Sequence, residues 1–217
     1  MLLYPDPRPH VGHHGVVVRE RETSEQPGRE AEVTVIMADL RGFTRLVERR
    51  TPPQAVALLD EGLTLLARPL LAAGGVVDKY VGDGVLAFFV GEDHAEGALG
   101  AARAVLERVA ADNAAHPGRA AWRVGVAVHS GRAMLGTVGP PERREFTLIG
   151  DVVNVVARLE EVAKQFELFL VASAETVRRA PRGAAGLSGP ERQPIRGRSG
   201  ALEVWYVANE DVLPWET

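Results

Sequence analysis

Two aspartates beside glycines are the residues of this sequence best placed to do chemistry. Asp39 ends an apolar run, Val33 to Ala38, and Asp83 lies between Gly82 and Gly84. An ionised carboxylate next to apolar strands is unfavourable unless something pairs with it. Two carboxylates at one sheet edge suit hard divalent cations, which can activate an attacking oxygen and neutralise a leaving group. The alternative is that Asp39 caps a helix and Asp83 shapes a turn.

Further polar residues could bind a substrate, although each also has a simpler explanation. Lys79 lies four residues before Asp83 and could equally be a solvated lysine on an edge strand. Asn154 and Arg158 are four residues apart, so on a helix they share one side and could hold a ribose or a phosphate. The alternative is a polar face on an exposed helix. Thr147 before that helix offers one hydrogen bond.

The elements that must position these residues follow from hydrophobic periodicity. Helical spacing predicts helices at 54–73, 93–115, 151–164 and 172–180. Strand-like runs lie at 33–38, 76–80, 85–90, 122–131, 132–139, 168–172, 194–197 and 201–208, with a turn or projecting arm at 140–150 and a loop at 181–192. Arg123 and Arg196 lie on two of these strands, where each alone indicates only a surface charge. Hairpins mixed with helices favour an α+β fold in which helices cover one antiparallel sheet.

Composition excludes several classes of function. The 217 residues, 46% of them hydrophobic, suffice for one globular domain, and residues 1–31 read as a polar leader or connector. With 25 Lys and Arg against 29 Asp and Glu, the net charge of −4 predicts no nucleic-acid partner. The absence of cysteine excludes disulfides and thiolate metal sites. We expect no membrane segment or signal peptide, and therefore a cytoplasmic protein.

Four motifs in a fixed order give these residues a common context. They are ADLRGFT at 38–44, KYVGDGVLAFF at 79–89, RVGVAVHSG at 123–131 and FTLIGDVVNVVARLE at 146–160. Together they closely resemble the catalytic domain of class III nucleotidyl cyclases, which convert ATP or GTP to a 3′,5′-cyclic nucleotide and pyrophosphate. The resemblance covers residues 32–208, leaving 209–217 as a tail. It implies a ferredoxin-like or palm-type antiparallel sheet covered by helices.

The resemblance also implies roles for the residues around the two aspartates. Asp39 and Asp83 match the family's ligands for two divalent cations, Mg²⁺ or Mn²⁺, with the backbone carbonyl of Leu40 expected to assist. Gly42 and Phe43 match the turn whose backbone N–H groups approach the nucleotide phosphates. The cations would pair the carboxylate of Asp39 at the end of its strand.

The same resemblance implies how the nucleotide is held. Lys79 and Thr147 match the pair that reads the purine; a lysine ammonium can donate to N1 of adenine, whereas N1 of guanine carries a proton, so ATP is the predicted substrate. Asn154 matches the asparagine that orients the ribose, and Arg158 the arginine that stabilises the transition state at the α-phosphate. Arg123 and Arg196 match positions that contact phosphates.

In this family the active site forms between two chains, which implies a twofold homodimer with two shared sites. Asp39 and Asp83 would come from one protomer, and the other four core residues from its partner. The alternatives are a catalytically silent module that binds nucleotide or dimerises, a guanylate cyclase, or a diguanylate cyclase or palm-type polymerase. A GG[DE]EF sequence is lacking, which disfavours the diguanylate alternative. Residues 1–31 are too short for a sensor domain, so a regulatory part is expected to be missing or not needed.

Overall fold

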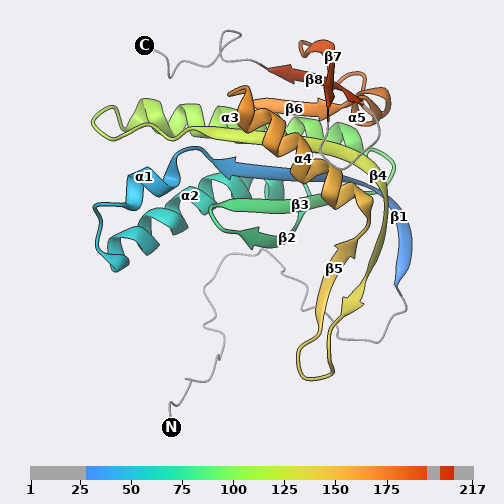
Figure 1. Cartoon of the computed structure of the whole chain (residues 1–217), viewed down its shortest axis with the longest axis horizontal. Coiled ribbons are helices and arrows are strands. Elements are labelled where there is room, and N and C mark those ends of the chain that lie inside the picture. Colours follow the sequence, from blue (N-terminus) through green and yellow to red (C-terminus); the bar gives the residue numbers. More distant parts are fainter. Residues whose placement is uncertain (1–27, 195–200, 208–217) are drawn as a thin grey trace.

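A mostly antiparallel sheet forms the centre of the molecule (Figure 1). The computed structural model describes residues 28–194 and 201–207 of the chain. Within these ranges the sheet has eight strands: seven follow the order β2-β3-β1-β4-β6-β8-β7, and β5 pairs with β4 outside this path. The strands are β1 (Arg29–Leu40), β2 (Val76–Val81), β3 (Gly84–Val90), β4 (Val124–Val138), β5 (Glu145–Ile149), β6 (Leu170–Ser173), β7 (Ser188–Pro194) and β8 (Ala201–Val207).

The described helices connect these strands in a ferredoxin-like pattern. They are α1 (Phe43–Val47), α2 (Pro52–Ala72), α3 (His94–Ala115), α4 (Asp151–Gln165) and α5 (Ala174–Arg179). The chain runs from β1 through α1 and α2 to the β2–β3 hairpin, then through α3 to β4, while the four strands lie in the order β2-β3-β1-β4. The predicted α+β class with a helix-covered antiparallel sheet is therefore confirmed, with one parallel pair, β4 and β6, among the described strands.

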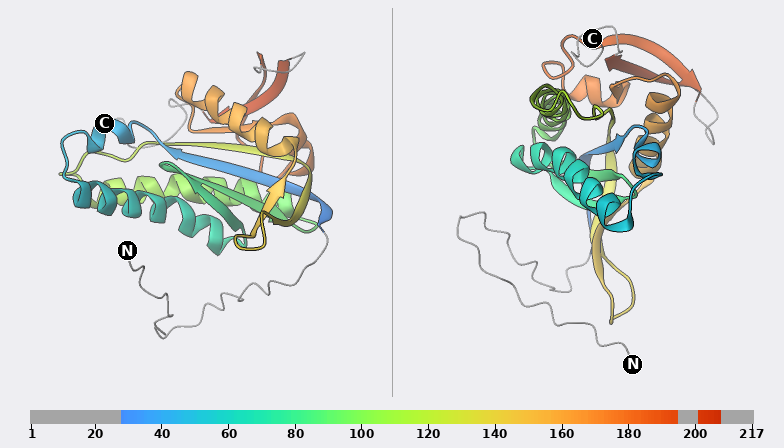
Figure 2. Two further views of the ribbon diagram at one scale, coloured as in Figure 1. Left: turned by 60° about the horizontal axis from the view of Figure 1, so that its bottom comes forward. Right: turned by 90° about the vertical axis from the view of Figure 1, so that its left-hand side faces the viewer.

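The centre of β1 is mostly apolar because helices cover both faces of the sheet. Ile36 and Ala38 pack in a buried cluster with α2 and α3, whereas Val33 and Val35 pack in a second cluster with α4. Alternate residues of a strand point to opposite faces, so both sets become buried. Figure 2 shows α2 and α3 on one side of the sheet and α4 on the other. By this alternation Asp39 belongs to the face that α4 covers.

β4 and β5 form a hairpin that extends beyond the rest of the sheet (Figures 1 and 2). β4 is 15 residues long. Its first part pairs with β1 and its last part with β5, so Thr147 of β5 lies opposite Gly136 of β4. The outer part of this hairpin carries a predicted purine-reading residue away from the central strands.

Three sequence predictions of local structure were wrong. Residues 122–131 and 132–139 are not a strand pair but parts of one strand, β4, because pairing with β1 continues past Gly131 as far as Leu135. Residues 145–149 within the predicted turn or arm form β5. The predicted loop 181–192 contains the start of β7, which pairs with β8.

Two further differences concern segment ends. β1 begins at Arg29, inside the segment expected to be a leader, because Arg29 to Glu32 pair with the outer part of β4. Residues 195–197, part of the predicted strand 194–197, lie outside the described residues. No helix among the described residues is both long and apolar enough to cross a membrane.

Candidate active site

The structure brings Asp39 and Asp83 together at one edge of the sheet. Asp39 is the second-last residue of β1 and lies opposite Gly84, the first residue of β3. Asp83 immediately precedes Gly84 in the hairpin turn, and its carbonyl accepts a 3.4 Å hydrogen bond from the backbone N–H of Leu40. A Cβ atom at Gly84 would lie 3.2 Å from Oδ1 of Asp39, so the glycine leaves space for the carboxylate.

The surroundings of Asp39 disfavour the ionised form of its carboxyl group. Burial, the largest cause, and the negative charges of Asp83 and Glu160 together raise the pKa of Asp39 to about 6, although the positive charges of Arg41 and Lys164 oppose the increase. Three carboxylates thus share one region that is only partly solvated. A hard cation with oxygen ligands would relieve this repulsion, so the donor set fits Mg²⁺ or Mn²⁺.

The protein alone does not provide a complete cation cage here. Among the described residues no group of three or more His, Cys, Asp or Glu side chains is arranged to hold a metal ion. Asp39 and Asp83 would supply two carboxylates, and the remaining ligands would have to be backbone oxygens, water or phosphate. Few protein ligands, completed by water and phosphate oxygens, are typical of Mg²⁺ sites in enzymes that act on phosphate substrates.

A buried ion pair links the end of β1 to α4. Nη1 of Arg41 donates to Oε1 of Glu160 at 2.6 Å and lies 3.8 Å from Oδ2 of Asp39. The backbone N–H of Arg41 donates to the carbonyl of Arg123 at 2.7 Å. A side chain at Gly125 would overlap the Arg41 guanidinium, so this glycine makes the ion pair possible. Sequence reasoning assigned no role to Arg41 or Glu160.

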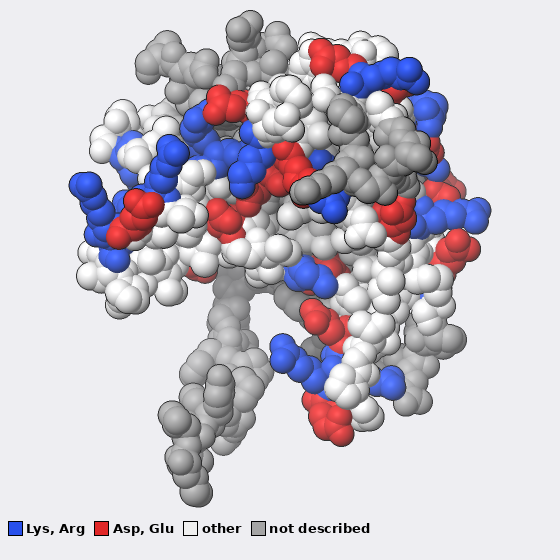
Figure 3. Space-filling model, viewed as in Figure 1, with Lys and Arg blue, Asp and Glu red and all other residues white. Residues whose placement is uncertain are grey.

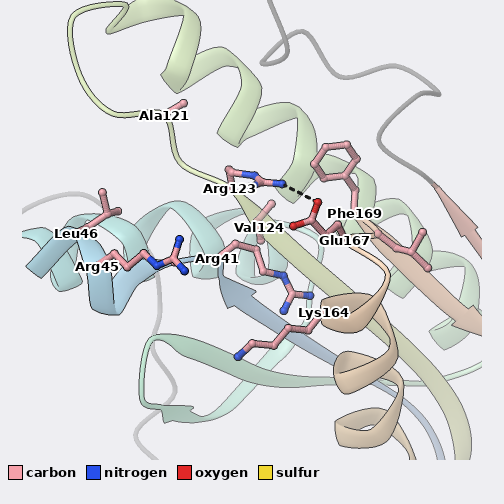
Figure 4. Close-up of a pocket in the computed structure, with 11 residues that line it drawn as sticks. Arg41, Arg45, Leu46, Ala121, Arg123, Val124, Lys164, Glu167 and Phe169 are labelled. Atoms are coloured by element: carbon pink, nitrogen blue, oxygen red, sulfur yellow. Dashed lines mark ion pairs between the residues drawn. The ribbon is translucent and has the colours of Figure 1, made fainter.

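A cavity of about 500 Å³ opens beside this ion pair and is lined by cationic side chains. Figure 4 shows Arg41, Arg45 and Lys164 around the cavity, with Arg123 turned toward Glu167. Arg123 lies 3.8 Å from the carboxylate of Glu167, and both side chains are largely exposed. On the face shown in Figure 3, blue side chains gather near α1, with red side chains among them. The cavity is therefore suited to an anion such as a polyphosphate.

The turn between β1 and α1 borders the same cavity. Gly42 has φ +71°, a left-handed conformation that glycine adopts without strain, and it precedes the first residue of α1. Phe43 packs against the core cluster on the α2 side, as does the buried side chain of Leu40. These two apolar anchors fix the backbone of the turn, so its N–H and C=O groups keep their positions.

The two predicted purine-reading residues meet at a third residue, Asp78. The hydroxyl of Thr147 donates to Oδ2 of Asp78 at 3.0 Å, and Nζ of Lys79 lies 3.3 Å from the same oxygen. Asp78 interrupts the pairing of β2 with β3: Val77 lies opposite Ala87 and Lys79 opposite Leu86. This β-bulge re-aims side chains that would otherwise alternate, so Asp78 and Lys79 approach each other although they are adjacent.

The remaining predicted residues lie apart from these groups. Asn154 is exposed on α4, and Arg158 pairs with Glu161 at 2.8 Å with 41% of its side chain exposed. Arg196 lies outside the described residues. Within the described part of one chain, no hydrogen bond or ion pair links the Asp39 region to Lys79, Thr147, Asn154 or Arg158.

Comparison with known proteins defines the class. The family model for the adenylate and guanylate cyclase catalytic domain matches residues 25–209. The chain belongs to this family.

Particular relatives agree with this assignment. Adenylate cyclase 1 of Rhizobium meliloti is 34% identical over 189 residues, covering 81% of this chain and 27% of the relative. An uncharacterized protein of Mycobacterium tuberculosis is 36% identical over 175 residues, which is 79% of this chain and 30% of the relative. The chain thus spans less than a third of the length of these relatives.

Solved structures support the fold. The crystal structure of the adenylyl cyclase CyaB from P. aeruginosa has a TM-score of 0.74 at 23% identity, covering 86% of this chain and 100% of that chain. The guanylyl cyclase Cya2 has a TM-score of 0.70 at 22% identity, covering 88% and 98%. At these identities the likeness concerns the fold alone.

Proposed function

We propose that this chain is an adenylate cyclase that converts ATP to 3′,5′-cyclic AMP and pyrophosphate. The observation that carries the proposal is the convergence of Lys79 and Thr147, from separate strands, on the carboxylate of Asp78. An ammonium next to a hydroxyl presents a short row of polar groups to the edge of a base. The Lys79 ammonium can donate to N1 of adenine but not to the protonated N1 of guanine.

Asp39 and Asp83 would hold two divalent cations, Mg²⁺ or Mn²⁺, with help from the backbone carbonyl of Leu40. When bound, these ions lower the pKa of the ribose 3′-hydroxyl and neutralise charge on the leaving pyrophosphate. The repulsion that raises the pKa of Asp39 supports this role, because cations would relieve it.

The cationic cavity would take the triphosphate. Gly42 and Arg123 line it. The backbone N–H groups of Gly42 and of Phe43, the next residue of the turn, would approach the phosphates, and Arg123 can leave Glu167 for a phosphate. We also propose a phosphate contact for Arg196. Positive charge at these positions stabilises pyrophosphate as the bond between the α-phosphorus and the bridging oxygen breaks.

Asn154 and Arg158 would complete the site from a second copy of the chain. Both lie on α4, where Asn154 is exposed and Arg158 pairs, among the described residues, with Glu161 of the same helix. In a twofold dimer, Asp39 and Asp83 of one protomer would face Lys79, Thr147, Asn154 and Arg158 of its partner. Asn154 would orient the ribose and Arg158 would stabilise the charge that develops at the α-phosphate.

Turnover of ATP and GTP by the purified chain, with Mg²⁺ or Mn²⁺, tests the proposal. We expect cyclic AMP and pyrophosphate from ATP, and loss of both products in Asp39→Ala. Cyclic GMP as the main product would contradict the choice of substrate. An absence of product from either nucleotide, at concentrations where the dimer is present, would favour a silent nucleotide-binding module.

Mixing two inactive variants tests the shared site. Lys79→Ala and Asp83→Ala chains should each be inactive alone, because each homodimer lacks one component in both sites. A heterodimer contains one intact site, whereas a wild-type dimer contains two. Each heterodimer in the mixture should therefore have about half of the activity of a wild-type dimer. A mixture that stays inactive while subunits exchange would exclude sharing.

A further inference from the structure

The carboxylate of Asp78 is almost completely buried, unlike the carboxylates of ion pairs on the surface. Only 1% of its side chain is exposed, whereas the Lys79 side chain beside it is 41% exposed. Oδ2 accepts from Thr147 and pairs with Lys79, and Oδ1 is buried with no hydrogen-bond partner among the described residues. Burying a carboxylate without a partner for one of its oxygens costs free energy of folding. A structural or functional role must therefore explain why Asp78 is present here.

The bond between Thr147 and Asp78 fixes the direction of a proton. A hydroxyl has one hydrogen to donate, and a carboxylate can only accept. In the bond of 3.0 Å, the hydrogen of Thr147 must therefore point to Oδ2 of Asp78. What Thr147 has left to offer a ligand is a lone pair, so its hydroxyl behaves toward that ligand as an acceptor.

Lys79 keeps the opposite character. Its ammonium has three hydrogens, and one directed to Asp78 at 3.3 Å leaves two for a ligand. The site therefore presents a donor from Lys79 and an acceptor from Thr147. Adenine has the complementary edge, with N1 as acceptor and the 6-amino group as donor. Guanine has the reverse at both positions, because its N1 carries a proton and its O6 accepts.

We propose that Asp78 is a specificity-determining positioning residue that selects adenine by committing the Thr147 proton. This inference rests on the proposed function, because it assigns the nucleotide selectivity of that same site. Threonine alone cannot select a 6-amino group over a 6-carbonyl, since a free hydroxyl can rotate to donate or to accept. Asp78 removes that freedom, and the bulge at Asp78 places its carboxylate within reach of both partners.

The competing explanation is that Asp78 only ties the β4–β5 hairpin to β2. Both explanations predict a loss of activity when Asp78 is changed, but they differ in the ratio of substrates. A tie between strands holds the site for any purine, so its loss lowers kcat/KM for ATP and GTP in parallel. If Asp78 instead fixes the direction of the Thr147 hydroxyl, the site distinguishes the two bases. Removing the carboxylate should then lower the ratio of kcat/KM for ATP to that for GTP.

The test compares kcat/KM for ATP and GTP in the wild-type full chain, Asp78→Asn, Thr147→Val and the double variant. We expect the ATP-to-GTP ratio to fall by about tenfold or more in Asp78→Asn, the scale of one charge-assisted hydrogen bond. Since Asp78 acts through Thr147, the double variant should match Thr147→Val within about twofold. Glu145→Gln, which removes an exposed carboxylate from the same strand as Thr147, is the control and should leave the ratio unchanged.

An unchanged ratio in a folded Asp78→Asn protein, or full additivity with Thr147→Val, would overturn the inference. Wild-type protein provides a second test if Asp78→Asn does not fold. Inosine triphosphate, which has a protonated N1 and a 6-carbonyl, should be as poor a substrate as GTP. The triphosphate of 2,6-diaminopurine, which keeps the adenine edge, should resemble ATP, and equal use of the inosine and diaminopurine nucleotides would contradict the proposal.

The inference can also be separated from the proposed function. If the wild-type chain forms no cyclic nucleotide, equilibrium binding of α,β-methylene ATP and α,β-methylene GTP gives the selectivity directly. Tighter binding of the ATP analogue that is lost in Asp78→Asn would support the role of Asp78 in an inactive protein. Equal affinity of the wild-type protein for the two analogues would reject it.

Discussion

At the end of β1, three carboxylates share one partly buried region, whereas at the bulge of β2 a single carboxylate is held between an ammonium and a hydroxyl. The first region contains Asp39, Asp83 and Glu160, and burial together with the repulsion among these carboxylates raises the pKa of Asp39 to about 6 even with Arg41 nearby. The second contains Asp78, whose Oδ2 already has two partners.

The difference indicates how each region meets its ligand. At the end of β1 the repulsion among carboxylates persists despite the positive charges of Arg41 and Lys164, so a bound cation would change the energy of this region greatly. At the bulge of β2, Oδ2 of Asp78 already has two partners within the protein, so a bound base would meet groups whose directions are already set. Removing a carboxylate should therefore abolish chemistry in the first region and change selectivity in the second.

The largest expected effect is on turnover in the first region. Asp39→Asn should lower kcat for ATP by about a thousandfold or more, because it would remove one of the two carboxylates proposed to hold the cations. Thr147→Val should lower kcat/KM for ATP by only about ten- to thirtyfold, the scale of one hydrogen bond. Steady-state assays at saturating Mn²⁺ measure both. A larger loss in Thr147→Val than in Asp39→Asn would contradict the different roles inferred for the two regions.

The next effect is stabilisation by cations without nucleotide. Mn²⁺ at a hundred times its dissociation constant adds about 2.7 kcal/mol to the free energy of unfolding, roughly 5–10 °C in Tm for a domain of this size. We expect thermal melting to show this increase in the wild-type protein and in Thr147→Val. Asp39→Asn should show little of it, and an equal increase in that variant would place the cation elsewhere.

A smaller effect should follow from crowding the ion pair at the end of β1. Gly125→Ala places a methyl group where the Arg41 guanidinium lies, which should cost about 1–3 kcal/mol in denaturant unfolding and lower activity. Gly118→Ala is the matched control, because a Cβ atom there meets nothing within 4 Å. Similar stability of the two variants would show that Arg41 has another place to go.

The smallest effect is a pH dependence of stability without cations. Because the pKa of Asp39 is raised from 3.8 to about 6 by folding, its ionisation opposes folding. Wild-type protein should therefore lose stability relative to Asp39→Asn as the pH rises from about 4 to 6. Each pKa unit corresponds to ~1.4 kcal/mol, and relaxation should reduce the difference to about 1 kcal/mol above pH 6. Parallel stability curves from pH 4 to 8 in chelator would reject this assignment of charge.

Local signals account for what could be predicted from the sequence. The Gly82-Asp83-Gly84 turn and the apolar run of β1 identified the two strands whose ends bring Asp39 and Asp83 together. The helical spacing of apolar residues in 151–164 identified α4 almost to its ends. These features depend on neighbours in the chain, which a sequence displays directly.

The features that escaped prediction depend on distant contacts or on register. Arg41 and Glu160 are 119 residues apart, and nothing near either residue indicates the other. Asp78 lies in the predicted strand 76–80 and received no role, because a bulge can be recognised only once the facing strand is known. Continuity of β4 through Gly131 depends on the length of β1, which proved greater than its apolar centre suggested.

The pairing of Thr147 with Gly136 has a consequence for how such a protein could evolve. One extra residue inserted in the tip, residues 139–144, could leave the number of residues in the turn unchanged. The chain would then shift by one position along β5 relative to β4. Phe146 would then occupy the place of Thr147, and the bond to Asp78 would vanish without any substitution in either residue. Under the proposed function, the choice of nucleotide would therefore depend on the length of this tip as well as on the residues proposed to touch the base.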